Sequence, residues 1–520
     1  MNFSSILSNM NNIAIQKPNA LKIAEYEKTA IANNNYGPAN TTLTDIQTAM
    51  ESTDEYIQSP EIANAMNQIT GTGGDDAIRA WSNEDGSITV SVNGQETVYD
   101  SQEAMNGFRV SSGDGNDSID FSSIGATLII NAGEGDNDIN LGYGRNIVKA
   151  GDGNNSVTAV GSYRTNISLG NGDNAISAGA DGNEYNTIVA GNGNNTIEIG
   201  NASGTIHTGN GNDSITTGNG NTKIYAGNGE NTVKAGNGNN YIQGGAGTDT
   251  ITAGNGNNVI YGLDGNDKIT AGNGKNYIDG GKGDDEIKAG SGKNIISGGK
   301  GDDKIETSGS GKIIDDGNGK NIKAEGADIS LYDSDAKSSL GSSIKIEGDD
   351  AFKMRIESDI ETYKGTESGT KLLSELDKAK KKTSIKETGD ANGYASATSK
   401  HYEDKYVSEK GKRGKGSDAE ILLNPSFSLV QGENTAPPST VLFHEGVHAY
   451  NDVTGTMQPG MLKRKDGTLV KAAEHQAVGL PIPGGIETKH PDGTKTSANP
   501  ELLTENAFRK DLGIDQRTRY

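Results

Sequence analysis

The chain has 520 residues, which is enough for several domains. Glycine contributes 74 residues and aromatic residues only 5%, so much of the chain is too poor in large apolar side chains for an ordinary globular core. The formal net charge of −23 argues against nucleic acid and anionic membranes as partners and favours cations. The chain has no cysteine and no apolar run of about 18 residues, so neither disulfides nor a transmembrane segment is expected.

Residues 1–65 are polar, and we expect them to form a helical or flexible export region. The first twenty residues lack a basic segment followed by a continuous apolar one, so they do not predict a cleaved secretory signal. Their Ser/Asn-rich, amphipathic composition is typical of the export signals of injected bacterial effectors. A plain flexible terminus is the alternative.

The next part of the chain is repetitive. Residues 87–99 alternate apolar and polar side chains about Asn93-Gly94, which predicts a β-hairpin. A long array follows, in which a β-branched residue recurs every nine positions between Gly-x-Gly turns. The recurring residues are Ile188, Ile197, Ile206, Ile215, Ile224, Val233, Ile242, Ile251, Ile260, Ile269, Ile278, Ile287, Ile296, Ile305 and Ile314. This period predicts a parallel β-roll over residues 66–330, with 18 residues per coil and stacked isoleucines inside.

The array resembles the RTX (repeat-in-toxin) family, whose nonapeptide is G-G-x-G-x-D-x-U-x. Residues 244–251, 262–269, 280–287 and 298–305 carry the likeness. The resemblance implies several structural calcium ions, each bound by oxygen ligands between successive turns. At 18-residue spacing, one edge of the roll carries Asp213, Asn231, Asp249, Asp267, Asp285 and Asp303. The opposite edge carries Thr222, Asn240, Asn258, Asn276, Asn294 and Lys312.

The two edges predict a one-sided roll. A neutral amide is a weaker calcium ligand than a carboxylate, so we expect calcium on the Asp edge and amide or hydroxyl ladders on the Asn edge. The predicted calcium ligands are Asp213, Asp249, Asp267, Asp285 and Asp303. Many turns read GNGNN, and the alternative is a purely structural solenoid that needs little calcium.

A Ser/Asp/Gly-rich stretch near residues 328–343 predicts a boundary, with a linker at 331–344 and a second domain at 345–520. In that domain we predict helices at 352–363 and 370–380, a surface loop at 394–416 and a short strand at 419–424.

Residues 441–450 contain the motif His-Glu-x-x-His. On a helix His444 and His448 lie on one face, where both can bind one zinc ion, and Glu445 can hold a water and take its proton. The chain has only six histidines, so this spacing is about a 1% coincidence, and zinc hydrolase chemistry is favoured over a structural pair. The strand at 419–424 could pair with an extended substrate beside this helix, or it could be a buried core strand.

A catalytic zinc needs a third protein ligand. Asn451 and Thr454 stand where the metzincin pattern requires Gly and His, which excludes that class. Glu474 lies on a predicted second helix and is the preferred ligand, in the gluzincin arrangement. The remaining candidates, each of which offers a ligand atom, are Glu505, Asp452 and His475.

Residues 345–520 resemble the NleD-like zinc metallopeptidases, effectors that bacteria inject into host cells. Residues 444–451, 474–480, 504–513 and 517–520 carry the likeness. The resemblance implies that His444, His448 and Glu474 bind zinc, that Glu445 is the base, and that the substrate is a protein. Known members act on host signalling kinases, and the long array departs from these small effectors.

The terminal Arg517-x-x-Tyr520 resembles the Arg-x-x-Tyr pair of clostridial neurotoxin light chains. That resemblance implies that Arg517 and Tyr520 are catalytic and stabilise the oxyanion of the tetrahedral intermediate. The alternative is a surface arginine and a docked terminal tyrosine.

The sequence therefore predicts a multidomain protein, with a parallel β-solenoid followed by an α+β zincin-like metallopeptidase domain. The expected function is that of a zinc-dependent endopeptidase, a secreted or injected bacterial effector or toxin that reaches the host cytoplasm and cleaves a host protein. It would bind one catalytic Zn²⁺ and several structural Ca²⁺, and act as a monomer. The alternative is a calcium-binding adhesive solenoid with an inactive C-terminal module.

Overall fold

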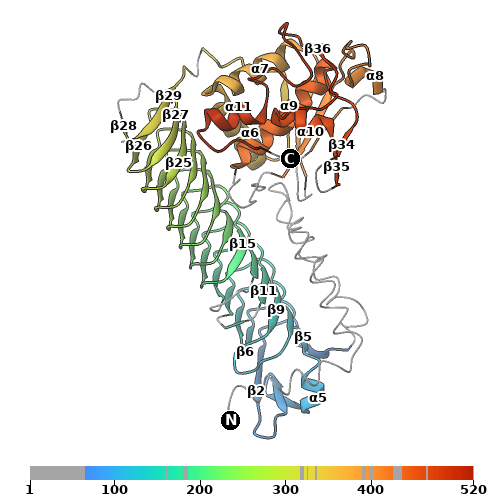
Figure 1. Ribbon diagram of the computed structural model, residues 1–520. Helices are drawn as coiled ribbons and strands as arrows, with labels where there is room; N and C mark the ends of the chain where they lie inside the picture. Colours follow the sequence, from blue (N-terminus) through green and yellow to red (C-terminus); the bar gives the residue numbers. More distant parts are fainter. Residues whose placement is uncertain are drawn as a thin grey trace.

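The computed structural model describes residues 65–520, except 160, 163, 180–184, 317–320, 325, 334–335, 389–393, 398–401, 425–435, 464–466 and 519–520. The helices expected within residues 1–65 therefore lie outside the described residues. Figure 1 shows a long solenoid, with a domain of helices and small sheets beside its C-terminal end.

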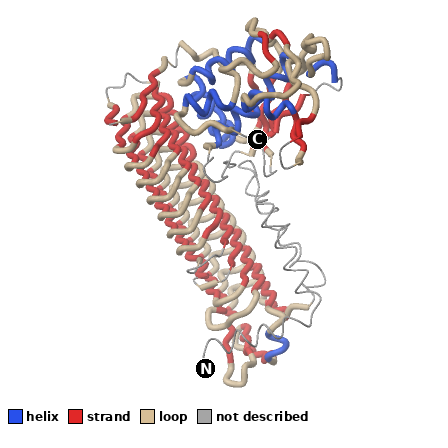
Figure 2. The backbone as a smooth tube through the Cα atoms, in the orientation of Figure 1, coloured by secondary structure: helices blue, strands red, loops and turns tan. Residues whose placement is uncertain are grey.

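The solenoid consists of two long sheets, and successive strands of the array alternate between them (Figure 2). Within the described residues the first sheet has 14 strands and the second has 15. The first contains β1 (Asn67–Thr70), β5 (Phe108–Ser111), β7 (Leu128–Asn131), β9 (Arg145–Lys149), β11 (Arg164–Ser168), β13 (Tyr185–Val189), β15 (Ser203–His207), β17 (Thr222–Tyr225), β19 (Tyr241–Ala246), β21 (Val259–Asp264), β23 (Tyr277–Lys282), β25 (Lys293–Lys300), β27 (Ser310–Asp315) and β29 (Ala327–Leu331). The second contains β2 (Ala77–Ser82), β3 (Ile88–Val92), β4 (Gln95–Tyr99), β6 (Ser118–Phe121), β8 (Asp138–Leu141), β10 (Ser156–Ala159), β12 (Ala175–Ala178), β14 (Thr196–Ile199), β16 (Ser214–Thr217), β18 (Thr232–Ala235), β20 (Thr250–Ala253), β22 (Lys268–Ala271), β24 (Glu286–Ala289), β26 (Lys304–Thr307) and β28 (Ile322–Ala324).

The N-terminal end of the second sheet is the predicted hairpin. Strands β3 and β4 pair antiparallel, and the chain reverses at Asn93 (φ 52°) and Gly94 (φ 83°). Two consecutive residues with positive φ form the type of two-residue turn that matches the twist of a hairpin. The short helix α5 (Ser101–Ala104) then leads into the coils.

Isoleucine ladders fill the space between the two sheets. In the first sheet Ile242 pairs with Ile260, and Ile260 pairs with Ile278. In the second sheet Ile251 pairs with Ile269 in the same way, and all five side chains are 0% exposed. Burial of one such side chain contributes roughly 1.5–3 kcal/mol, so the ladders supply the core that the composition otherwise lacks. The parallel solenoid is therefore confirmed, with 18-residue coils from β13 to β25, whereas the coils between β5 and β13 have 18–21 residues.

Close stacking of the coils explains the glycines in the turns. Gly265 has a φ of +138°, and a Cβ atom there would lie 2.0 Å from the carbonyl oxygen of Gly247 in the preceding coil. A side chain at this position would therefore require both a strained backbone and a wider spacing between coils.

The last full coil corrects two details of the predicted repeat. Strands β25 and β27 pair Ile296 with Ile313, so this coil has 17 residues instead of 18. Ile313 therefore continues the interior ladder, and Ile314 faces outward. Lys312 likewise lies on the strand instead of at the Asn edge, and its Nζ contacts Asp328 at 2.7 Å. The periodicity could not reveal the deletion, because isoleucine occupies both positions 313 and 314.

The C-terminal domain is built around a four-stranded sheet with the order β30-β31-β33-β32. Its strands are β30 (Ile344–Glu347), β31 (Thr383–Glu387), β32 (Tyr394–Ala397) and β33 (Ala419–Leu423). The helices are α6 (Asp350–Lys364), α7 (Glu367–Lys378), α8 (Tyr402–Lys405), α9 (Pro438–Thr454), α10 (Ala472–Val478) and α11 (Glu505–Asp511). Two small hairpins pair β34 (Met461–Lys463) with β35 (Leu469–Lys471), and β36 (Thr488–Lys489) with β37 (Lys495–Thr496).

The structure decides between the two alternatives for the strand at 419–424 and corrects the expected loop at 394–416. β33 pairs with β31 on one side and β32 on the other, and Ala419, Ile421 and Leu423 are each 2% exposed. It is therefore a core strand, and both of its edges are already used. The predicted loop at 394–416 contains the strand β32, which ends the sheet within the described residues, and the helix α8. The helices predicted at 352–363 and 370–380 are confirmed as α6 and α7.

The hydrophobic core of the C-terminal domain extends onto the solenoid. One buried cluster includes Tyr261 and Ile295 of the solenoid together with Phe352 and Ile360 of α6. Helix α6 lies along the outer face of the first sheet, over β21, β23 and β25. Among the described residues no helix is both long and apolar enough to span a membrane.

Candidate metal centres

Helix α9 positions the first two candidate ligands. Pro437 precedes it, and Gly455, in the left-handed region at φ 67°, ends it. His444 and His448 lie one turn apart on this helix, and their Nε2 atoms are 3.1 Å apart. Both residues are more than nine-tenths buried, so the helix holds their imidazole rings in a protected position.

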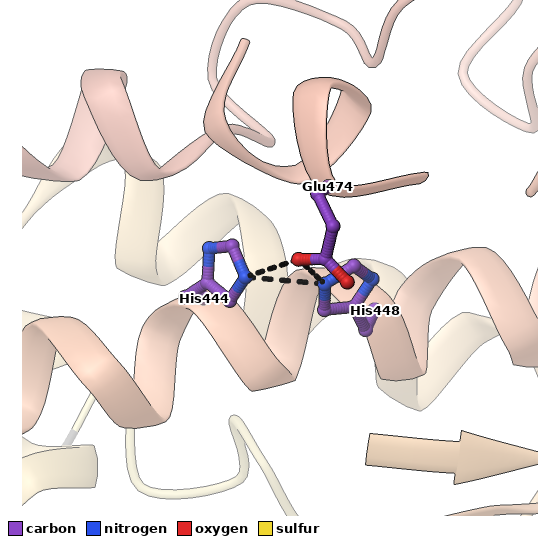
Figure 3. Close-up of side chains that lie close together, drawn as sticks. All are labelled: His444, His448 and Glu474. Carbon is purple, nitrogen blue, oxygen red and sulfur yellow. Dashed lines mark hydrogen bonds and ion pairs between the residues drawn. The ribbon is translucent and has the colours of Figure 1, made fainter. Parts of the chain in front are cut away.

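Glu474, in the first turn of α10, completes a triangle with the two histidines (Figure 3). Its Oε2 atom lies 3.3 Å from Nε2 of His444 and 3.2 Å from Nε2 of His448. Ligand atoms bound to a tetrahedral zinc at about 2.0–2.2 Å lie about 3.3–3.6 Å apart. A small outward movement of these three groups would therefore admit one ion, and their chemistry fits zinc.

The other candidate ligands lie elsewhere. Glu505, at the start of α11, accepts a hydrogen bond from Nδ1 of His444 at 2.9 Å, on the ring side opposite the triangle. Asp452 is fully buried, and it is not part of the His444–His448–Glu474 group. The Nδ1 atom of His475 donates to the carbonyl oxygen of Pro481 at 3.1 Å. The geometry thus supports Glu474 as the third ligand.

The sequence indicates Glu505 only as an alternative zinc ligand, and it does not reveal that Glu505 orients the His444 ring. Its carboxylate is 1% exposed and also accepts bonds from Arg509 Nε at 2.6 Å and Arg517 Nη1 at 3.1 Å. A carboxylate on the outer nitrogen of a ligating histidine fixes the tautomer and the orientation of the ring. The four-residue spacing of Glu505 and Arg509 was the available signal for this buried pair.

The charges around His444 are strongly coupled. Burial alone would lower the pKa of His444, but hydrogen bonds to Glu474 and Glu505 raise it to about 10. Burial opposes ionisation of both carboxylates, yet the bonds to the histidines hold the pKa of Glu474 well below its usual range and that of Glu505 at about 2. Both carboxylates are therefore negative at neutral pH, so Glu474 can bind a cation directly and Glu505 can stabilise it through the His444 ring.

The remaining predicted catalytic residues are placed only in part. Glu445 follows His444 on α9, is 8% exposed, and its charge helps to raise the pKa of His444. Arg517 reaches the site through Glu505, and Asn506 holds its backbone with two hydrogen bonds. Tyr520 lies outside the described residues.

Removal of the Glu505 charge is expected to weaken the metal site and the fold together. In Glu505→Gln, the amide can no longer neutralise Arg509, which is 1% exposed. Loss of one partner of a buried ion pair costs about 3–5 kcal/mol, and loss of an outer-shell partner lowers metal affinity about 10- to 100-fold.

Zinc competition titration and urea unfolding of the full chain measure these two effects. The control is Glu487→Gln, because Glu487 forms an exposed ion pair with Lys495 and its loss should change neither quantity. Unchanged zinc affinity in Glu505→Gln would contradict the orienting role.

The Asp edge of the solenoid is a second candidate metal site. Each aspartate uses Oδ1 to accept the backbone N–H of the preceding coil, for example Asp285 from Asp267 at 2.7 Å. The Oδ2 atoms are buried and have no hydrogen-bond partner in Asp213, Asp249, Asp267, Asp285 and Asp303. A row of buried carboxylate oxygens without donors fits the oxygen ligands that calcium requires.

Burial and neighbouring carboxylates make this edge difficult to ionise. Burial raises the pKa of Asp249 and Asp267 to about 7, that of Asp303 to about 8 and that of Asp285 to about 9. At the C-terminal end of the edge, Asp303, Asp315 and Asp316 form a group whose ligand atoms lie within 4.8 Å of one another. A divalent cation along the edge would favour the ionised form.

The Asn edge is satisfied without a cation. Nδ2 of Asn258 donates to the carbonyl oxygens of Gly254 and Gly256 and to Oδ1 of Asn276, at 2.8–3.1 Å. Asn240 and Asn276 repeat the same pattern in neighbouring coils. The structure therefore supports the predicted difference between the edges, and one-sided calcium occupancy stays a prediction.

Removal of one asparagine side chain from this ladder is expected to destabilise the solenoid by the same amount with and without calcium. Asn258→Ala leaves buried carbonyl groups without donors, and each such group costs about 1–3 kcal/mol. Urea unfolding of the full chain in calcium-containing and calcium-depleted buffer measures the change. A loss that calcium abolishes would show that the Asn edge also binds the ion.

Comparisons with known proteins match both parts of the chain. Residues 341–520 match the Peptidase M91 family, which is described as "Effector protein". A model described as "RTX calcium-binding nonapeptide repeat (4 copies)" matches residues 129–159, 199–233, 225–260, 234–269, 252–287 and 270–305. No curated protein and no solved structure matches the chain.

Proposed function

We propose that the C-terminal effector domain of the Peptidase M91 family, which this chain carries behind calcium-binding RTX repeats, is a zinc-dependent endopeptidase that cleaves a host protein. The observation that carries the proposal is the triangle of His444, His448 and Glu474, with edges of 3.1–3.3 Å. A zinc ion bound there would polarise the scissile carbonyl and a water molecule.

The protein residues supply proton transfer and orientation. Glu445, next to His444 on α9, takes the proton of the attacking water and passes it to the leaving amine. Glu505 holds the His444 ring, so that Nε2 faces the cation. Arg517 fixes Glu505, and its role in stabilising the oxyanion together with Tyr520 remains part of the proposal.

The position of β32 supports an extended protein substrate. β32 ends the four-stranded sheet within the described residues, and α9 packs against it. An extended peptide can add to a free sheet edge through backbone hydrogen bonds, which would hold it beside the metal helix. This edge replaces β33 as the proposed substrate strand.

The proposed enzyme acts outside the cell that produces it. The description of the matched family as an effector supports secretion and a host target, and the RTX match supports calcium binding by the solenoid. Calcium would stabilise the coils after export, because the buried Oδ2 atoms of the Asp edge have no hydrogen-bond partner. The proposed active form is a monomer.

A proteome cleavage experiment tests this function. The full chain, loaded with zinc and calcium, is incubated with a protein extract, and new N-termini are identified by mass spectrometry. We expect a limited set of cleavages that disappears when 1,10-phenanthroline removes zinc and returns when zinc is added. Cleavage that persists without zinc, or no cleavage by the zinc-loaded chain, would contradict the proposal.

A further inference from the structure

Helix α6 joins the solenoid to the C-terminal domain through buried polar contacts. Arg355 and Asp359 are both 0% exposed, although they lie where the two parts meet. The Arg355 guanidinium lies 3.8 Å from the centre of the Tyr261 ring, and the Tyr261 hydroxyl donates to Asp359 at 3.4 Å. Because this charged pair is covered by solenoid residues, separation of the two parts would expose it and remove its aromatic partner.

Two further strands of the solenoid hold the same helix. The Thr362 hydroxyl lies 3.2 Å from Oδ2 of Asp279 on β23 and 3.1 Å from the Ser297 hydroxyl on β25. At the rim, Lys282 contacts Glu357 at 2.9 Å and Lys300 contacts Glu361 at 3.1 Å. Three successive coils therefore fix one face of α6.

The C-terminal end of α6 packs against α9 and α11, the two helices that position His444. The Tyr363 hydroxyl donates to the carbonyl oxygen of Ser439 in the first turn of α9, at 2.6 Å. Its ring packs edge-on against Phe443 and Phe508, at centroid distances of 5.6 and 5.1 Å. Phe443 precedes His444, and Phe508 lies on α11 with Glu505, so Tyr363 contacts both helices that orient His444.

The strands that contact α6 also pack against the aspartates of the Asp edge. Tyr261, Asp279 and Ser297 are the contact residues on the three strands, and each is followed directly by a glycine. A Cβ atom at Gly262, Gly280 or Gly298 would lie only 2.2–2.3 Å from Oδ2 of Asp267, Asp285 or Asp303, respectively. The backbone that presents each α6 contact therefore packs directly against a candidate calcium ligand.

We propose that calcium at Asp267, Asp285 and Asp303 controls the affinity of the distant His444–His448–Glu474 site for zinc, through the docking of α6. The proposal rests on the zinc site of the proposed function. With calcium bound, the three strands hold α6, and Tyr363 fixes α9 and α11. Without calcium, the buried Oδ2 atoms of these aspartates have no partner, the strands that pack against them loosen, α6 loses its surface, and the ligand triangle loses its support.

Such coupling is reciprocal, because it is a free energy shared by two sites. If calcium raises the zinc affinity by a given factor, zinc must raise the calcium affinity by the same factor, in the range of about 5- to 150-fold. The chain would then bind zinc more tightly where calcium is available, or where calcium-loaded protein persists.

The test uses the full chain and two titrations. Zinc affinity is measured by competition with a chromophoric chelator, at saturating calcium and in buffer depleted of calcium by a resin, since soluble calcium chelators also bind zinc. We expect at least about fivefold weaker zinc binding without calcium, and a matching shift of the calcium titration when zinc is present.

Variants separate the docking path from a general effect of calcium. Asp285→Asn lies under α6 and should remove most of the coupling, whereas Asp213→Asn, four coils earlier on the same edge, should preserve it. Asparagine is tolerated in this ladder, since Asn231 occupies it naturally. Thr362→Val breaks the contacts to Asp279 and Ser297 without altering a ligand, and it should also reduce the coupling.

Each outcome is decisive. Equal zinc affinity with and without calcium would overturn the coupling and leave the proposed zinc peptidase intact. Equal effects of Asp285→Asn and Asp213→Asn would overturn the path through α6. A chain that binds no zinc in either buffer would overturn the proposed function, and the coupling with it.

Discussion

Glu445→Gln is expected to abolish cleavage while the zinc content stays unchanged. Glu445 is adjacent to His444 but does not belong to the ligand triangle, so the ion retains all three protein ligands. The amide cannot accept the proton of the attacking water, and loss of a general acid–base group lowers the rate about 10²- to 10⁴-fold. Cleavage rates and metal content of the full-length variant, measured on the same preparation, test this result.

The control for this variant is Glu409→Gln, an exposed carboxylate that is not part of the candidate ligand group, and it should cleave at the normal rate. Glu445→Gln protein that cleaves as fast as the unaltered chain would show that another group moves the proton. Protein that loses zinc as well as activity would show that Glu445 supports the metal site instead of the chemistry.

Without calcium, the solenoid is expected to be less stable at about pH 8 than at about pH 5, and calcium is expected to reverse this order. The pKa values of the Asp-edge carboxyls are raised by burial, to about 7 for Asp267 and about 9 for Asp285. The folded chain thus keeps protons that the unfolded chain releases near pH 4. Stability is highest at low pH and falls as the pH rises from about 4 to about 9.

The size of this effect follows from the shifts. One pKa unit corresponds to about 1.4 kcal/mol, so ionising a single buried carboxyl with a pKa near 7 costs about 4 kcal/mol. Thermal unfolding followed by the β-sheet signal of circular dichroism, in calcium-depleted and calcium-containing buffer, measures the change. Asp285→Asn removes the highest pKa and should flatten the pH dependence. Equal unfolding temperatures at both pH values without calcium would contradict the account.

The features that repeat or that occupy one helix could be predicted from the sequence. The nine-residue period fixes the strands, the coil length and the inward isoleucines, because each coil contacts only its neighbours. The four-residue spacing of His444 and His448 similarly fixes their relation on α9. The gluzincin arrangement favours Glu474 as the third ligand, but its place 3.2 Å from His448 depends on the packing of α10, which no local pattern encodes.

The sequence could not reveal features that depend on long-range packing. The shortened coil before β27 is hidden by two adjacent isoleucines, and only strand pairing identifies Ile313 as the interior one. The sequence predicts β33 as a short strand but does not show that it is an interior one. It is interior because it pairs with β31 on one side and, on the other, with β32, which lies in an expected loop. The contact of Glu505 with His444 joins residues 61 positions apart, so it required the folded domain.

The zinc content of the full chain and of its Glu474→Ala variant, measured by mass spectrometry with calcium present, tests the central claim most directly. The full chain is required because the core around α6 includes solenoid residues. The account predicts one zinc per chain in the unaltered protein and a zinc content well below one per chain in the variant, because a direct ligand is lost. A full chain without zinc, or a variant that retains it undiminished, would contradict the metal centre of His444, His448 and Glu474.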